Sequence, residues 1–384
     1  MGSRLSINQR KKGGRSSDRL NVGFVPTMDC ATLIAAKELG LFADLELDVC
    51  LSREVGWATI REKLLHEELD AVAAHASVLI SIHCGIGVVP RSCLTGLILS
   101  SRGSAVTLSN ELWELGARDA ETTGEIIRSR KGMRSFVFGI VLELSTQHYL
   151  LRQWLLSARL DPETDVHIVV IPSALIYEHF SKGFLDGYCV AEPWNSAAVM
   201  NQKGWIVTTA ADAAMTQPEK VLLVLEDFAT ERENAHLRLL AALISASRFC
   251  DDPANRADLA AMLAKKCYFD VPKDYLKSAL VGPFQTGHGI SQQDTFIAFD
   301  AASIGAPTRA AGQSMLDLVR SFGRTTKVPP FPSDLLEKTF RQDIYDQATR
   351  LEQAQRLSPV STPAEIPATP WLQANDRTCA VTSA

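Results

Sequence analysis

The sequence lacks the features of membrane, secreted and nucleic-acid-binding proteins. No stretch reaches the ~18 uninterrupted apolar residues of a membrane span, and no apolar core of a secretory signal follows the basic residues near the N-terminus. The net charge of −5 provides no overall basic field of the kind that attracts nucleic acid. We therefore expect a cytoplasmic protein without a membrane span or direct nucleic-acid binding, unless a signal sequence precedes Met1.

Paired cysteines and known catalytic motifs are also missing. The eight cysteines are scattered with no CxxC pair, which favours buried, reduced thiols over disulfides or a metal site. The chain has no GxSxG, HExxH, P-loop or GxGxxG motif. The sequence thus predicts no catalytic residue, no metal and no cofactor, although an enzyme with another mechanism stays open as an alternative.

What is present is the composition and periodicity of an α/β protein. The 384 residues are 46% apolar and 22% charged, enough for two or three globular domains. Short apolar strands alternate with amphipathic helices in two successive series, the order of parallel sheets with right-handed crossovers. In the first series, strands are expected at 20–26, 45–51 and 69–74, and helices at 29–39 (capped by Asp29), at 57–65 and from 76.

The second series has the same design. Strands are expected at 135–141, 166–171, 188–191 and 205–209, and helices at 146–158, 173–181 and 193–202. We interpret the two series as two lobes whose carboxyl strand ends face each other across a cleft. The expected division is a basic flexible arm (1–19), lobe 1 (20–128 plus 224–323), lobe 2 (129–223), a C-terminal docking segment (324–356) and a low-complexity tail (357–384).

Polar residues at strand ends and helix starts suggest where a ligand binds. Helix N-termini offer free N–H groups and partial positive charge, and a lysine in the same cleft would balance an anion. Each residue also has a plain structural explanation, such as core packing for Trp57, helix capping for Gln147 and His148, solvation for Lys220 and a local ion pair for Glu192. The candidate ligand-binding residues are Trp57, His75, Ser104 and Thr107 (both in an expected loop, 103–109), Gln147, His148, Glu192 and Lys220.

Several segments resemble the nitrate/nitrite- and bicarbonate-binding family of ABC-transporter receptors, which includes the cytosolic nitrate/nitrite sensor of the NasS type. The resemblance runs from about residue 20 to about residue 350. It rests on GFVP (23–26), DCA (29–31), LSREVGWATIREKL (51–64), AVTLS (105–109), YLLRQWL (149–155), GYCVAEPWN (187–195), PEKVL (218–222) and CDDP (250–253).

The resemblance implies a two-lobed, periplasmic-binding-protein-like fold of type II that closes on a small planar oxyanion. It implies that Trp57 forms a wall of the pocket, that His148 or Gln147 donates to the anion, and that Lys220 supplies the positive charge. Nitrate binders of the family carry a lysine at this place, whereas the bicarbonate binder has an acidic residue and recruits a metal cation. Lys220 therefore favours nitrate or nitrite.

The chain departs from the family pattern at two places. Ser104 stands where the family usually presents an amide side chain, and Gln147-His148 stands where it usually shows a His-Asn pair. These departures leave the choice between nitrate and nitrite open.

The resulting hypothesis is a cytosolic nitrate/nitrite sensor for nitrate assimilation. The resemblance implies that its partner is an RNA-binding antiterminator of the two-component type, released when the anion binds. One alternative is the solute-binding component of an ABC-type importer of nitrate or another small oxyanion. The other alternative is a small-molecule enzyme on the same fold.

Overall fold

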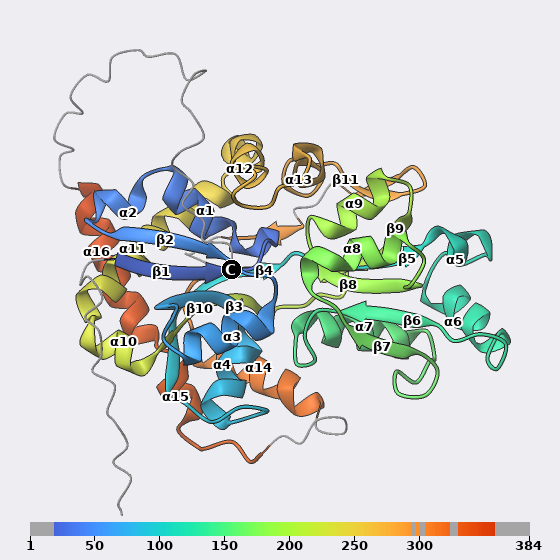
Figure 1. Ribbon diagram of the computed structural model, residues 1–384, viewed down its shortest axis with the longest axis horizontal. Coiled ribbons are helices and arrows are strands. Elements are labelled where there is room, and N and C mark those ends of the chain that lie inside the picture. The colour runs from blue at the N-terminus through green and yellow to red at the C-terminus, as the bar shows by residue number, and fades with distance from the viewer. Residues whose placement is uncertain (1–18, 293–295, 300–303, 323–328, 358–384) are drawn as a thin grey trace, which may run out of the picture.

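The chain folds around two separate β-sheets. The computed structural model describes residues 19–292, 296–299, 304–322 and 329–357. Nearly all of the expected basic arm and of the low-complexity tail lies outside these ranges, as does the start of the expected C-terminal docking segment. Figure 1 shows the two sheets in the two halves of the molecule.

The first sheet has the strand order β13-β4-β10-β3-β1-β2. Its strands are β1 (Arg19–Phe24), β2 (Asp48–Arg53), β3 (Ala71–His75), β4 (Cys93–Arg102), β10 (Pro218–Leu225) and β13 (Ile297–Ala298). β1 pairs in parallel with β2 and β3, as the alternating series predicts, while β10 runs antiparallel between β3 and β4. β10 therefore brings the chain back from lobe 2 into the middle of the lobe 1 sheet.

The second sheet has the order β7-β6-β8-β5-β9. Its strands are β5 (Ser104–Ser109), β6 (Val137–Ile140), β7 (His167–Val170), β8 (Gly187–Ala191) and β9 (Gly204–Thr209). The expectation of a loop at 103–109 was wrong, because β5 is an inner strand that pairs antiparallel with both β8 and β9. By strand pairing, the chain passes into lobe 2 between β4 and β5, earlier than the expected crossing after residue 128.

Helices cover both sheets (Figure 1). Those of the first half are η1 (Met28–Cys30), α1 (Ala31–Glu38), α2 (Leu41–Asp44), α3 (Trp57–Leu65), α4 (Ala76–Cys84), α5 (Asn110–Glu114), α6 (Ala120–Ser129), α7 (Thr146–Ser157), α8 (Ser173–Ser181) and α9 (Trp194–Met200). The later ones are α10 (Glu226–Glu231), α11 (Glu233–Asp251), η2 (Pro253–Asn255), α12 (Arg256–Leu263), α13 (Lys273–Leu280), α14 (Arg309–Ser321), α15 (Leu335–Thr339) and α16 (Gln342–Leu357).

The C-terminal third differs most from expectation. A hairpin of β11 (Phe284–Gly287) and β12 (Ile290–Gln292) lies in a region for which no strand was expected. The expected C-terminal docking segment (324–356) contains two helices, α15 and α16, because Phe340 between them is extended and forms a parallel bridge with Thr95 of β4. No helix in the described ranges is long and apolar enough to cross a membrane.

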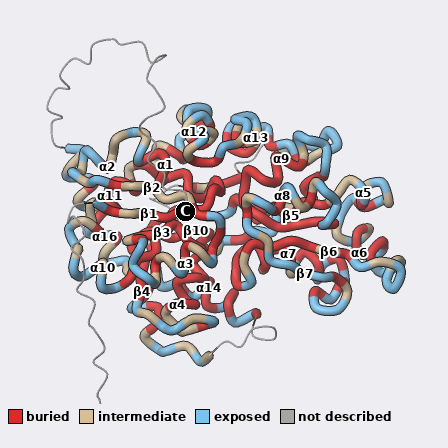
Figure 2. The backbone as a smooth tube through the Cα atoms, in the orientation of Figure 1, coloured by how far each residue is buried: buried red, intermediate tan, exposed pale blue. Residues whose placement is uncertain are grey.

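Buried residues fill both lobes and the region between them (Figure 2). One apolar cluster contains Val25 and Trp57 from lobe 1 together with Val141 and Tyr188 from lobe 2. The backbone N–H of Met28 donates to the carbonyl of Glu192 at 2.7 Å, which joins the two lobes directly. The structure is therefore one in which the lobes are in contact, as in a closed binding protein.

Close packing of α6 against the end of α7 gives a first testable prediction. A Cβ added at Gly124 would lie 2.0 Å from the carbonyl oxygen of Ala158, which is backbone and cannot move away easily. Gly124→Ala should lower the free energy of unfolding by about 1–3 kcal/mol, although alanine is ordinarily the better helix former. Urea unfolding checks this, with the exposed Glu125→Ala on the same helix as control; equal stability of the two variants would contradict the packing described.

Candidate anion-binding site

The site is built around Lys220, whose side chain is completely buried. Lys220 lies near the start of β10, opposite His75 at the carboxyl end of β3. A lysine ammonium is costly to remove from water unless charged or polar partners surround it. The partners of Lys220 therefore define the chemistry of this part of the molecule.

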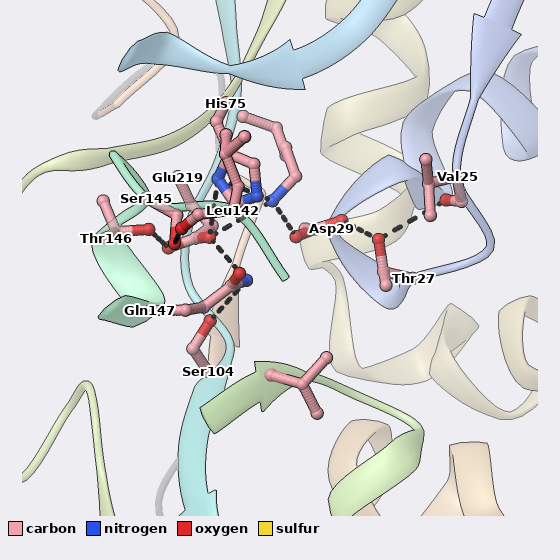
Figure 3. A network of polar contacts seen from close by, with 12 residues as sticks. Val25, Thr27, Asp29, His75, Ser104, Leu142, Ser145, Thr146, Gln147 and Glu219 are labelled. Atoms are coloured by element: carbon pink, nitrogen blue, oxygen red, sulfur yellow. Dashed lines mark hydrogen bonds and ion pairs between the residues drawn. The ribbon is translucent and has the colours of Figure 1, made fainter. Parts of the chain in front are cut away.

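Two carboxylates surround the ammonium. Lys220 Nζ donates to Asp29 Oδ2, and it lies 3.1 Å from Glu219 Oε1. Thr27 fixes the Asp29 carboxylate by donating to its other oxygen at 2.6 Å (Figure 3). The expectation that Asp29 caps the first helix was wrong, since Cys30 occupies the N-cap position of α1 without a side-chain hydrogen bond.

Glu219 links the two lobes. Thr146 Oγ1 donates to its Oε2 at 2.6 Å, and Gln147 Nε2 donates to its Oε1 at 3.0 Å. Both donors lie in the first turn of α7 in lobe 2. Gln147 Nε2 also donates to Ser104 Oγ at 3.1 Å, which extends the network to β5 (Figure 3). A continuous set of polar contacts thus runs from Asp29 in lobe 1 to Ser104 in lobe 2.

Aromatic rings close the other side of the ammonium. The Trp57 ring meets the His75 ring edge-on, with centroids 4.4 Å apart, and Lys220 Nζ lies 4.8 Å from the centre of the Trp57 ring. The second distance is that of a cation–π contact. Trp57 Nε1, His75 Nε2 and Gln147 Oε1 are buried and have no hydrogen-bond partner among the residues described. Buried polar atoms usually have a hydrogen-bond partner. A small ligand with several polar atoms would supply partners for these three.

Burial sets the protonation of the site. It lowers the pKa of His75 well below the usual range, and the nearby Lys220 lowers it further, so His75 is neutral. Burial raises the pKa of Glu219, with the charge of Lys220 opposing it. Burial alone would lower the pKa of Lys220, but Asp29 and Glu219 outweigh it and the net direction is up. The ammonium is charged and already faces two carboxyl groups.

Three of the predicted residues direct their side chains elsewhere. Thr107 donates to Asn195 Oδ1 at 2.8 Å inside lobe 2. The Nδ1 of His148 contacts the carbonyl of Glu143, and the ring lines a surface hollow of about 300 Å³. The Glu192 carboxylate accepts from the Ser196 N–H at 3.1 Å. The structure brings the other five predicted residues together around the ammonium and Glu219, namely Trp57, His75, Ser104, Gln147 and Lys220.

The sequence interpretation missed three members of the network, namely Asp29, Thr146 and Glu219. Glu219 directly precedes Lys220, and an acidic residue beside a lysine in an apolar strand was the available signal. In the described part of the chain, no group of three His, Cys, Asp or Glu side chains is arranged to hold a metal ion. No disulfide joins the described cysteines, which include all but Cys379.

The unpartnered indole N–H of Trp57 gives a second prediction. Trp57→Phe keeps a ring against His75 but removes a donor, so it should weaken binding of a small anion by about 1.5–3 kcal/mol, one to two decades in Kd. Stability without ligand should change little. Isothermal titration checks this, with Trp205→Phe as the control because Trp205 Nε1 is also buried without a partner in the described residues, but lies in the core of lobe 2. Equal loss in both variants would contradict a ligand contact at Trp57.

Comparison with known proteins identifies the family. The sequence profile of the NMT1-like family matches residues 13–264. The chain belongs to this family. The chain is 31% identical over 354 residues to the bicarbonate transport ATP-binding protein CmpC of Synechococcus elongatus, a match that covers 90% of the chain and 52% of CmpC. It thus spans about half the length of several curated relatives that it matches.

Proteins that are named as nitrate-binding proteins, and not as ATP-binding proteins, also match this NMT1-like chain. The nitrate/nitrite binding protein NrtA of Synechococcus elongatus is 26% identical over 346 residues, covering 86% of this chain and 77% of NrtA. The crystal structure of the periplasmic nitrate-binding protein NrtA from Synechocystis PCC 6803 superposes with a TM-score of 0.80 at 21% identity, covering 89% of this chain and 92% of that one. The expected α/β, two-lobed periplasmic-binding-protein fold is confirmed.

Proposed function

We propose that this chain is a solute-binding unit for a small oxyanion of the nitrate or bicarbonate class, of the kind that serves ABC-type importers. The observation that carries the proposal is the buried Lys220 network, which draws on both lobes and leaves Trp57 Nε1, His75 Nε2 and Gln147 Oε1 without partners in the described residues. The names of the relatives CmpC and NrtA support the ligand class. NrtA is named as a binding protein and not as an enzyme, and this chain is similar to it in sequence and in fold.

Isothermal titration of the purified protein with nitrate, nitrite, bicarbonate and sulfate tests the proposal. At least one of the three small monoanions should bind with one ion per chain, and sulfate, larger and doubly charged, should bind much more weakly. The absence of binding heat for every ion, with protein shown to be folded by circular dichroism, would refute the proposal.

The finer hypothesis of a cytosolic sensor that controls an antiterminator stays a prediction, as does the cytoplasmic location. The relatives bear the names of transport and binding proteins, which favours the importer component as its partner. The two functions differ in a measurable way. An importer component should stimulate ATP hydrolysis by its transporter when the anion is present, whereas a sensor should bind a soluble antiterminator in the absence of the anion and release it when the anion is added.

A further inference from the structure

The charge balance around Lys220 is unusual for an anion site. One ammonium faces two carboxyl groups, those of Asp29 and Glu219, and all three side chains are buried. The other titratable groups near Glu219 are His75 of β3, whose Nδ1 lies 3.5 Å from Glu219 Oε1, and Cys189 of β8. Burial lowers the pKa of His75 and raises the pKa of Cys189 far from their usual values, so both are uncharged. The charge of the cluster is therefore set by Lys220, Asp29 and Glu219.

Binding of an oxyanion that has only acceptor atoms, such as nitrate, is electrostatically unfavourable at this site. With both carboxylates ionised, its arrival beside Lys220 would place three negative charges around one positive charge among buried side chains. Like charges in a buried site disfavour one another's ionised forms, and burial disfavours any net charge. One proton on a carboxylate would remove the excess charge and would convert an acceptor into a donor.

Glu219 is better placed than Asp29 to take that proton. Asp29 accepts hydrogen bonds from lobe 1 alone, from Lys220 and Thr27. Glu219 lies between the lobes and accepts from Lys220 of lobe 1 and from Thr146 and Gln147 on α7 of lobe 2, so the contacts of its carboxyl group depend on how the two lobes meet. Burial raises the pKa of the Glu219 carboxyl, which favours its protonated form.

We propose that Glu219 couples anion binding to proton uptake, so that nitrate enters the site together with one proton on the Glu219 carboxyl group. The inference rests on the proposed oxyanion-binding function and adds how the same site is regulated. The proton comes from the buffer and forms an O–H bond on Glu219, while the anion takes its place beside Lys220. The net charge of the occupied site then equals that of the empty one.

Titration calorimetry of nitrate tests the coupling through the number of protons taken up. Binding heats measured in two buffers of different ionisation enthalpy should give a proton uptake that grows with pH towards one proton per nitrate, and Kd should rise about tenfold for each pH unit above the pKa of Glu219. Glu219→Gln, which is neutral at every pH, should remove both the proton uptake and the pH dependence. At pH 8 it should bind nitrate at least tenfold more tightly than the natural protein.

Glu192→Gln is the matched comparison, since Glu192 is a second buried glutamate near the lobe junction. It should keep the proton uptake of the natural protein.

Nitrate binding without proton uptake in the natural protein would overturn the coupling while leaving the proposed function standing, and this measurement needs no variant to fold. Proton uptake that survives in Glu219→Gln or disappears in Glu192→Gln would overturn the assignment to Glu219. Failure of the folded natural protein to bind any oxyanion between pH 5.5 and 8.5 would refute both proposals.

Discussion

Replacing Lys220 with methionine should lower the free energy of unfolding by about 3–5 kcal/mol at pH 7.5, because it leaves the carboxylates of Asp29 and Glu219 buried without a counter-ion. The same change should weaken anion binding by at least one decade in Kd, since a charge-assisted contact contributes about 1.5–3 kcal/mol. The destabilisation should be smaller at pH 5.5. A buried glutamate whose pKa is raised in the fold destabilises it as pH rises and is harmless once protonated.

Urea unfolding at the two pH values measures this effect, and Lys182→Met is the control. Lys182, just after the end of α8, also pairs with a glutamate, Glu178, but more than half of each side chain is exposed to solvent. Removal of an exposed pair should change stability little and with no dependence on pH of this kind. If the Lys220 variant were as stable as the Lys182 variant, the buried ion network would not have the role assigned to it.

Replacing Glu192 with glutamine should stabilise the protein at neutral pH. Burial raises the pKa of Glu192 from 4.5 to about 7, against the opposing hydrogen bonds from Ser196. Between these two pH values the unfolded chain loses the proton while the folded protein retains it, so the stability contributed by this group is complete below pH 4.5 and is lost as pH rises to about 7. The difference corresponds to about 3 kcal/mol, and glutamine, which does not ionise, should not show it.

Stability curves from pH 4.5 to pH 8 for the natural protein and Glu192→Gln measure this difference, which should grow with pH and level off above pH 7. The exposed Glu125→Gln variant should run parallel to the natural protein. Parallel curves for Glu192→Gln would show instead that the carboxylate of Glu192 is solvated or paired in solution.

Local sequence patterns were sufficient where an element is defined by its own residues. The helices α3 and α8 begin and end at the predicted residues, since each has an apolar face and a clear N-terminal boundary. The strand β5 was mistaken for a loop because Gly103, Ser104 and Ser109 are typical loop residues. Its strand character comes from pairing with β8 and β9, which are far away in the sequence.

The site was predicted only in part, for related physical reasons. Asp29 stands where a helix cap is expected, yet its carboxylate accepts a hydrogen bond from Lys220, a buried lysine 191 residues further along the chain. Gln147 and His148 are adjacent on α7 and so point in directions about 100° apart; only Gln147 reaches the network. The sequence could not decide between them, because the rotation of α7 against β10 depends on how the two lobes meet.

The most direct test of the central claim is a crystal structure of the protein with bound nitrate or bicarbonate. We predict a trigonal planar ion between the two sheets, within hydrogen-bond distance of Lys220 Nζ and Trp57 Nε1. An ion bound elsewhere, with Lys220 still enclosed by Asp29 and Glu219, would contradict the account.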